Sequence, residues 1–311
     1  MSGRPRIVLL VATARGLRVL RAALAALPDA DYTVVTFREG ADEPPFCDAI
    51  AQAAAAASAR FAVQRTLGPA GSGLPWTEPQ DVMLAAGWRY LVPGSVYESM
   101  RRGAYVLHDS LLPAYRGFAP TVWALVNGEE QVGATLLTMA AGADEGDIIA
   151  QHSIPVGDDD RIAEVMERVT GCYERIIADW LPRLLAGPVP TRPQDAAQAT
   201  YGCKRADIDN RIFWQWPTKR IYNLIRAVTR PYPGAWTTHR GARVTIWGAS
   251  PVGKPRTWAG RSPGRVVEVR RGVGVVVLTG DGEILIREAQ AEGGPADSAD
   301  RIVASITDTL Q

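Results

Sequence analysis

The sequence predicts an α/β protein with a doubly wound, mostly parallel sheet and a smaller C-terminal β-barrel domain. Apolar runs typical of buried strands alternate with helical patterns up to residue 108, a long amphipathic helix pattern follows, and short strand patterns separated by turns fill the C-terminal part. In open α/β sheets, ligands bind beyond the carboxyl ends of the strands. We therefore expect functional residues in loops that follow strands.

The first predicted strand is the continuous apolar run at 7–12. After a predicted turn at 13–16, apolar side chains recur at helical spacing, which predicts a helix. The alternation continues with strands expected at 32–37, 61–64, 81–86 and 105–108 and with helices expected at 48–60 and 95–102. Strands this apolar are buried on both faces, which is typical of parallel sheets.

Residues 161–185 carry the clearest helical pattern, with one apolar stripe and acidic residues at its start. Three prolines within 187–193 break the periodicity and indicate a linker or strap. A short helix is expected at 221–228, and strands are expected at 242–247, 264–269, 274–278 and 283–288. We predict a first domain at 1–186, a linker at 187–205 and a β-rich domain at 206–311.

Composition argues against several classes of protein. The 311 residues contain 34 Lys plus Arg and 33 Asp plus Glu, and a net charge of +1 argues against nucleic-acid binding by bulk charge. The three cysteines form no CxxC pair, so neither a disulfide framework nor a metal site is indicated. No apolar stretch approaches the roughly 18 to 20 residues of a membrane span, so we expect a cytoplasmic protein with no membrane partner.

Two loops depart from these patterns. His108 ends an apolar strand, and proline and glycine punctuate the loop after it, His108-Asp-Ser-Leu-Leu-Pro-Ala-Tyr-Arg-Gly117. Asp144 lies in a second, glycine-bracketed loop, Gly142-Ala-Asp-Glu-Gly-Asp147, after a strand-like run at 133–139. Both loops follow strands, so the sequence predicts that the imidazole and the carboxylate meet at one edge of the sheet.

These motifs resemble the signature of the formyltransferases that use N10-formyltetrahydrofolate. The resemblance rests on the loop from His108 to Gly117 and on Asp144-x-Gly-Asp-Ile-Ile149, and it extends to Pro231-Tyr-Pro-Gly-Ala235. It covers residues 80–250 well. It implies a Rossmann-like catalytic domain with an OB-like C-terminal barrel, as in methionyl-tRNA formyltransferase and the sugar-nucleotide N-formyltransferases.

The resemblance implies a one-carbon transferase that moves a formyl group from folate to an acceptor amine, with N10-formyltetrahydrofolate as co-substrate. The family's catalytic trio is an Asn, a His two residues later and the loop Asp, and these positions hold Val106, His108 and Asp144 here. An amide that donates to an oxyanion is worth about 10²- to 10³-fold in rate, and an isopropyl group donates nothing. Val106 is therefore a serious departure from the family.

Three hypotheses follow from Val106. In the first, formyl transfer continues, with charged His108 or a loop N–H stabilising the oxyanion. In the second, the site has been retuned to another donor or acceptor or to folate hydrolysis. In the third, the protein is a folate- or nucleotide-binding relic with little catalysis. Purely structural interpretations also stay open for His108 and Asp144. A histidine can cap a strand through a hydrogen bond, and Asp beside Gly is common in turns.

The resemblance places the folate pocket along the segment before the histidine strand and acceptor contacts along the loop after it. The expected folate-binding residues are Trp88, Arg89, Tyr90, Leu91 and Val92, together with Asp144. The expected substrate rim is Ser110, Tyr115, Arg116 and Gly117. The alternatives are core packing for the first set, a loop-fixing hydroxyl for Ser110 and a solvated surface arginine for Arg116.

The predicted acceptor is a small amine. Methionyl-tRNA formyltransferases carry a basic insertion where residues 38–45 are acidic here, and only 206–311 has a basic excess, with 15 Lys plus Arg against 10 Asp plus Glu. A tRNA acceptor therefore ranks second. The resemblance of 103–108 and 200–205 to sugar-nucleotide N-formyltransferases favours a nucleotide-linked amino sugar or another specialised-metabolite amine, and a homodimer is left open as the assembly.

Overall fold

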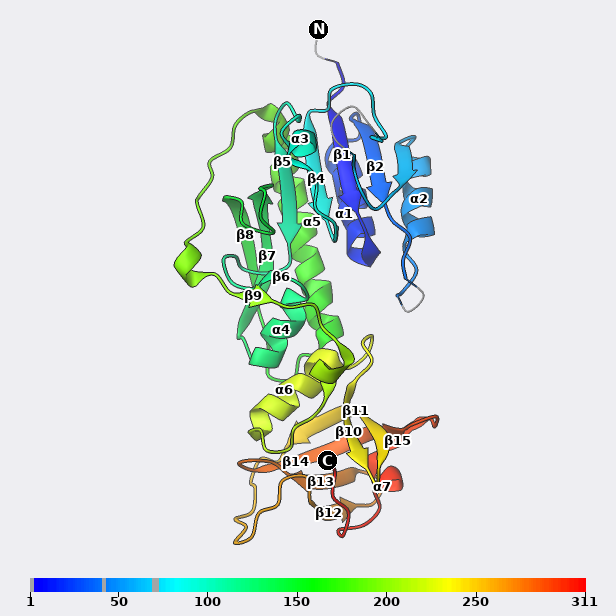
Figure 1. The fold of residues 1–311 in the computed structure, drawn as a ribbon, viewed down its shortest axis with the longest axis vertical. Coiled ribbons are helices and arrows are strands. Elements are labelled where there is room, and N and C mark those ends of the chain that lie inside the picture. Colours follow the sequence, from blue (N-terminus) through cyan, green and yellow to red (C-terminus); the bar gives the residue numbers. More distant parts are fainter. Residues whose placement is uncertain (1–2, 41–42, 69–72) are drawn as a thin grey trace. The chain divides into compact units, whose positions relative to one another are not determined.

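The computed structural model describes residues 3–40, 43–68 and 73–311 (Figure 1), so the acidic stretch at 38–45 falls partly outside the described residues. The chain forms two compact units that interleave along the sequence. The first comprises Met1–Gly117, Val132–Ile154 and Glu167–Gly202, and the second comprises Phe118–Gln131, Pro155–Met166 and Cys203–Gln311. None of the helices in the described ranges combines the length and the apolar character that a bilayer span needs.

The first unit is built on a sheet that has seven strands within the described residues. They are β1 Arg6–Val11, β2 Asp31–Thr36, β3 Arg60–Val63, β4 Val82–Ala86, β5 Ala104–His108, β7 Gln131–Thr138 and β8 Ile148–Pro155. The order is β3-β2-β1-β4-β5-β7-β8, parallel from β3 to β5, with β7 antiparallel to β5. The predicted mostly parallel α/β sheet is confirmed.

The helices of this sheet region are α1 Thr13–Ala26, α2 Cys47–Ala56, α3 Gly94–Tyr97 and α5 Ile162–Ala186. The long α5 begins in the second unit and continues into the first. Its Tyr173 is buried there and donates its hydroxyl to the backbone oxygen of Leu107 in β5 at 3.1 Å. The helix α5 therefore lies against β5, the strand that carries His108 (Figure 1).

Several helices differ from their predicted bounds. α2 ends at Ala56 rather than at 60, and α6 (Thr218–Val228) begins three residues before its predicted start. α1 begins at Thr13, inside the predicted turn. The chain turns after β1 at this one residue, whose φ is +68°, so no separate turn of four residues is needed. α3 ends at Tyr97 rather than at 102. Its extension is prevented because the amides of Arg101 and Arg102 donate to backbone oxygens of the segment that leads into β4.

The elements missed in the sequence include β8, the helix α4 (Pro120–Asn127), the strand β10 (Ala235–His239) and, near the end of the chain, β15 (Ala296–Ser298) and α7 (Ala299–Ile302). β8 alternates half-buried with exposed positions and carries polar residues such as Gln151 and Ser153, so it has no apolar run to detect. α4 has eight residues, too few for a clear helical period. Short or polar elements of this kind depend on their neighbours for stability.

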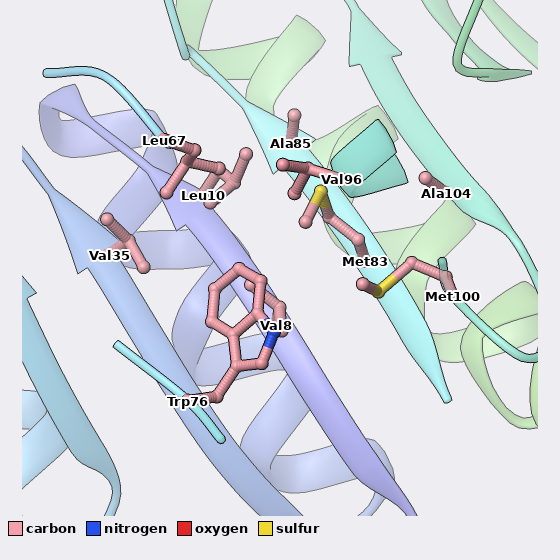
Figure 2. Packing of buried hydrophobic residues seen from close by; sticks show 10 residues of the cluster. All are labelled: Val8, Leu10, Val35, Leu67, Trp76, Met83, Ala85, Val96, Met100 and Ala104. Atoms are coloured by element: carbon pink, nitrogen blue, oxygen red, sulfur yellow. The ribbon is translucent and has the colours of Figure 1, made fainter. Parts of the chain in front are cut away.

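A buried apolar cluster packs between the first unit's sheet and α3 (Figure 2). Its members are Val8, Leu10, Val35, Leu67, Trp76, Met83, Ala85, Val96, Met100 and Ala104. Full burial of one such large side chain contributes about 1.5–3 kcal/mol. Trp88, Val92 and Val106 pack against the same cluster, so this core supports both the segment predicted for folate and the position of the missing amide.

The second unit contains an antiparallel sheet. Its described strands are β10, β11 Ala242–Pro251, β12 Val266–Arg270, β13 Gly274–Leu278, β14 Glu283–Ala291 and β15 Ala296–Ser298. The order is β10-β11-β14-β13-β12, and β15 pairs with β14. β11 continues beyond its predicted end at 247, through a register irregularity near Gly248. In the same unit, α4 packs against α6, which spans Thr218–Val228.

The last residues of the chain close this sheet. Leu310 forms a bridge to His239 at the end of β10, and Thr309 forms a bridge to Arg265 beside β12. Since β10 and β12 are the two ends of the strand order, the C-terminal segment connects the open edges. The predicted C-terminal β-rich domain is confirmed, and the closure gives it a barrel-like character.

Candidate active site

His108 is the last residue of β5 and is 7% exposed. Its Nε2 lies 2.8 Å from the backbone oxygen of Tyr115, and its Nδ1 lies 3.4 Å from Oδ1 of Asp144. A carbonyl oxygen only accepts, so Nε2 carries a proton and donates it to Tyr115. The structure thus brings together the imidazole and the carboxylate that the sequence placed in two loops.

Asp144 connects the two loops. Its Oδ1 faces His108, and its Oδ2 accepts the backbone N–H of Gly117 at 2.9 Å. A glycine is required at 117 because its φ is +91° and a Cβ there would lie 2.9 Å from the backbone oxygen of Gly202. One carboxylate therefore fixes both the histidine and the end of the loop that follows it.

The position of Asp144 gives the His108 ring a counter-charge. When the ring is doubly protonated, Nδ1 and Oδ1 of Asp144 form an ion pair across 3.4 Å while Nε2 donates to the Tyr115 oxygen. The carboxylate therefore lies where it stabilises a positive charge that arises on the imidazole.

Val106 lies two residues before His108 in β5, on the same side of the strand. Its half-buried isopropyl group packs against a small apolar cluster of Leu112, Leu137 and Ile148. Hydrocarbon therefore occupies the position at which the resemblance calls for an amide. A polar side chain placed here would lie beside the imidazole.

The loop residues predicted as a substrate rim are largely engaged within the protein. Ser110 is 4% exposed and donates its hydroxyl to the backbone oxygen of Ala114 at 2.7 Å. Arg116 is also 4% exposed, and its Nε and Nη2 donate to Oε1 of Gln194 at 3.1 and 2.9 Å. Its guanidinium lies 5.8 Å from the ring centre of Tyr201. The loop is thus held by its own polar side chains.

The segment predicted for folate follows β4 and is rich in aromatic contacts. Trp88 packs edge to face against Phe37 and Tyr90, with ring centres 5.6 and 5.7 Å apart. Arg89 lies over the Phe37 ring at 5.5 Å, whereas Leu91 is 76% exposed. The indole Nε1 of Trp88 is buried and finds no hydrogen-bond partner among the described residues.

Comparison with protein families agrees with this arrangement. Residues 72–180 match the family model described as formyl transferase, and residues 206–306 match the model of the formyl transferase C-terminal domain. Together the two matches cover more than half of the chain. The first of them includes both loops of the candidate site, the one after His108 and the one that carries Asp144. The chain belongs to the formyltransferase family.

Solved structures share the formyltransferase fold. HypX from Aquifex aeolicus in complex with tetrahydrofolic acid is 20% identical at a TM-score of 0.62, over 98% of this chain and 48% of that chain. WlaRD, a sugar 3N-formyltransferase solved in the presence of dTDP and 5-N-formyl-THF, is 16% identical at 0.69, over 94% and 100%.

The N-formyltransferase from Helicobacter canadensis, solved with folinic acid and dTDP-3-aminofucose, is 16% identical at a TM-score of 0.70, over 91% of this chain and 99% of that chain. This formyltransferase chain therefore spans about half the length of HypX and nearly the whole length of the two sugar N-formyltransferases.

Two contacts beside the candidate site were not predicted from the sequence. Gln194 bonds to both loops of the site, and its only sequence signal is its place just after the proline-rich stretch. Asp109, the residue after His108, forms an ion pair with Arg15 of α1 at 2.9 Å.

Proposed function

We propose that this formyltransferase moves the formyl group of N10-formyltetrahydrofolate to the amine of a small acceptor. The observation that carries the proposal is the contact between His108 Nδ1 and Asp144 Oδ1 at the carboxyl edge of the sheet. Folates in the solved structures of HypX and of the two sugar N-formyltransferases support the choice of co-substrate.

The reaction needs a group that handles protons beside the transferred carbon. The acceptor nitrogen attacks the formyl carbon, the carbonyl electron pair moves to oxygen, and a tetrahedral intermediate forms. Its collapse breaks the bond to folate N10, and the proton lost by the amine must reach that nitrogen. In this scheme His108 takes up the proton that the amine loses and passes it to folate N10, and Asp144 stabilises the ring while it carries the charge.

Val106 leaves this scheme without a neutral donor to the oxyanion. The positive charge that His108 carries during the reaction supplies part of the missing stabilisation. A positive imidazolium close to a developing oxyanion stabilises it most where water is excluded, and His108 is buried. The amide that is missing at 106 corresponds to about 3 to 4 kcal/mol of transition-state stabilisation. We therefore expect slower transfer than an enzyme with the complete trio would achieve.

For the acceptor we propose a nucleotide-linked amino sugar. Support comes from the dTDP and dTDP-3-aminofucose that accompany the two sugar N-formyltransferases in their solved structures. Methionyl-tRNA is the alternative acceptor, favoured by the basic excess of residues 206–311.

Val106 also favours a second candidate function, a diverged site that hydrolyses formyl-folate or binds it with little turnover. Hydrolysis differs from transfer only in that water replaces the amine as the attacking group. The packing of Val106 against three apolar side chains supports this candidate, because the apolar residue has apolar partners at this position.

Substitution of Val106 separates these functions. Purified wild-type protein, Val106→Asn and the similarly sized control Val106→Leu are incubated with N10-formyltetrahydrofolate, with and without dTDP- and UDP-linked amino sugars or methionyl-tRNA. We expect Asn, and not Leu, to raise formyl transfer about 10-fold or more, because it restores an oxyanion donor. A loss with Asn indicates a retuned site. Absence of both turnover and folate binding in the wild type refutes folate use.

A further inference from the structure

A strap of residues 191–202 crosses both loops of the candidate site within the first unit. Thr200 accepts the N–H of Arg116 through its backbone oxygen, and its hydroxyl accepts the N–H of Tyr115. The short strands β6 (Arg116–Gly117) and β9 (Tyr201–Gly202) pair in parallel. The strap also reaches the second loop, because the Thr191 hydroxyl donates to Asp147 at 3.2 Å.

Gln194 is the strap residue whose side chain bonds to both loops. Its Nε2 donates to the backbone oxygens of Asp144 and Gly146 at 2.8 and 2.7 Å. Its Oε1 accepts two N–H groups from the buried guanidinium of Arg116. An amide has two donors and an acceptor oxygen with two lone pairs, so all of its hydrogen-bonding capacity is used.

These contacts hold Asp144 both by its backbone and by its carboxylate. The backbone of Asp144 is held by Gln194, while its Oδ2 is held by the N–H of Gly117, the residue next to Arg116. Asp144 sits at a φ of +58°, an uncommon conformation for a residue that is not glycine. Such a backbone persists when its surroundings hold it in place.

We propose that Gln194 is a positioning residue for the His108–Asp144 pair: it locks the two catalytic loops to each other through one side-chain amide. The expected effect of Gln194 on the reaction rate rests on the proposed function. The expected effect of Gln194 on the position of Asp144 rests on the geometry alone. Loss of the amide frees the Asp144 carboxylate to move away from Nδ1 of His108, and displacements of about 1 Å at a reacting group can cost about 10²-fold in rate.

The test compares Gln194→Met with Gln198→Met. Gln198 is a matched control because it lies in the same strap and its side-chain amide bonds only to Asp195 in the described part of the chain. We expect Gln194→Met to lower kcat about 10- to 100-fold with KM for folate and acceptor changed less than about 3-fold, and Gln198→Met to leave both near wild type.

A second variant, Gln194→Glu, distinguishes a positioning role from a loss of activity caused by lower stability. Gln194→Glu keeps an acceptor for Arg116 and adds an opposite charge, yet it loses the two N–H donations to Asp144 and Gly146. We expect Glu to lower kcat as Met does while the thermal midpoint stays within a few degrees of wild type. Wild-type kcat in Gln194→Glu overturns the proposal.

A readout without turnover keeps this inference separate from the proposed function. The chain has three histidines, His108, His152 and His239, so their ring ¹⁵N signals can be resolved by NMR. We expect Gln194→Met to shift the His108 ring signals and leave the other two unchanged. Unchanged His108 signals overturn the proposal even if formyl transfer is active, and a selective shift supports it even if the wild type transfers no formyl group.

Discussion

His108 shows how a single residue depends on its two neighbouring loops. Its Nε2 lies 2.8 Å from the Tyr115 oxygen and its Nδ1 lies 3.4 Å from Oδ1 of Asp144, so the loops fix the orientation of the imidazole. Val106, two residues before it in β5, packs against apolar side chains. The proposed chemistry therefore uses the imidazole and its carboxylate where the resemblance calls for a neutral amide as well.

Trp88 provides a prediction at this scale. Its buried Nε1 has no partner among the described residues, and an unmade buried hydrogen bond costs about 1–3 kcal/mol. We expect Trp88→Phe to weaken folate binding about 5-fold or more, since a ligand loses this donor, without lowering the free energy of unfolding. Equilibrium binding of tetrahydrofolate and urea unfolding measure the two quantities. Unchanged affinity would exclude the indole N–H from the folate site.

Residues of the site differ in how far sequence could predict them. His108 and Asp144 stand in long motifs after strands, and their meeting follows from sheet topology. Gln194 lies 50 residues from Asp144, and its contacts depend on the path of an irregular strap that no periodicity describes. The burial of Arg116 follows from the same strap, and its charge gave no hint of it.

Among the elements, α6 is capped from a distant loop. Its preceding residue is Pro217, which makes no side-chain cap, and Asp281 fills the role by accepting the N–H and hydroxyl of Thr218 at 2.7 and 2.9 Å. The hydrogen bond from the Thr218 backbone N–H is the largest cause of a lowered Asp281 pKa, since it favours the ionised carboxylate.

We expect Asp281→Ala to lower the free energy of unfolding by about 1 kcal/mol at pH 7. The folded-state pKa lies below the unfolded value of about 3.9, so the contribution is complete above that value and is lost as pH falls through the folded pKa. The difference in free energy of unfolding between wild type and variant should therefore decrease at acidic pH. Urea unfolding at a series of pH values measures it. The exposed Asp179→Ala is the control, and an equal gap at every pH contradicts the assignment.

Elements were predictable from sequence where side-chain pattern alone stabilises them. β1 after Arg6 and the whole of β4 are buried and apolar, and α5 carries its apolar stripe along a helix of 25 residues. The polar β8 and the eight-residue α4 carry no such signal, because their neighbours stabilise them. The early end of α3 likewise follows from backbone hydrogen bonds to another segment, which local propensity does not encode.

On the scale of the whole chain, a few terminal residues complete the second unit. The Leu310 N–H donates to the Gly264 oxygen at 2.9 Å, and Gln311 exchanges two backbone hydrogen bonds with Thr238. Leu310 is 2% exposed, so the segment adds apolar burial to the strand connection. The order of the strands could be foreseen only in outline, since this closure joins segments about 45 to 70 residues apart.

We expect Leu310→Ala to lower the free energy of unfolding by about 2–4 kcal/mol, because it removes a buried side chain at the point of closure. Hydrogen exchange should accelerate first at the backbone amides of Thr238 and Leu310. Ile306→Ala, at a position 60% exposed a few residues earlier, is the matched control and should change little. Equal effects of the two substitutions would show that the terminal segment does not close the sheet.

The central claim is that His108 and Asp144 act as one catalytic unit on formyl-folate. The most direct measurement is the rate of deformylation of bound N10-formyltetrahydrofolate in wild type, Asp144→Asn and His108→Gln, with folate affinity measured in parallel. The account predicts a loss of about 10²-fold or more in each variant with affinity nearly unchanged, and no further loss in the double variant. Wild-type rates in Asp144→Asn, with the same fold and affinity, would contradict it.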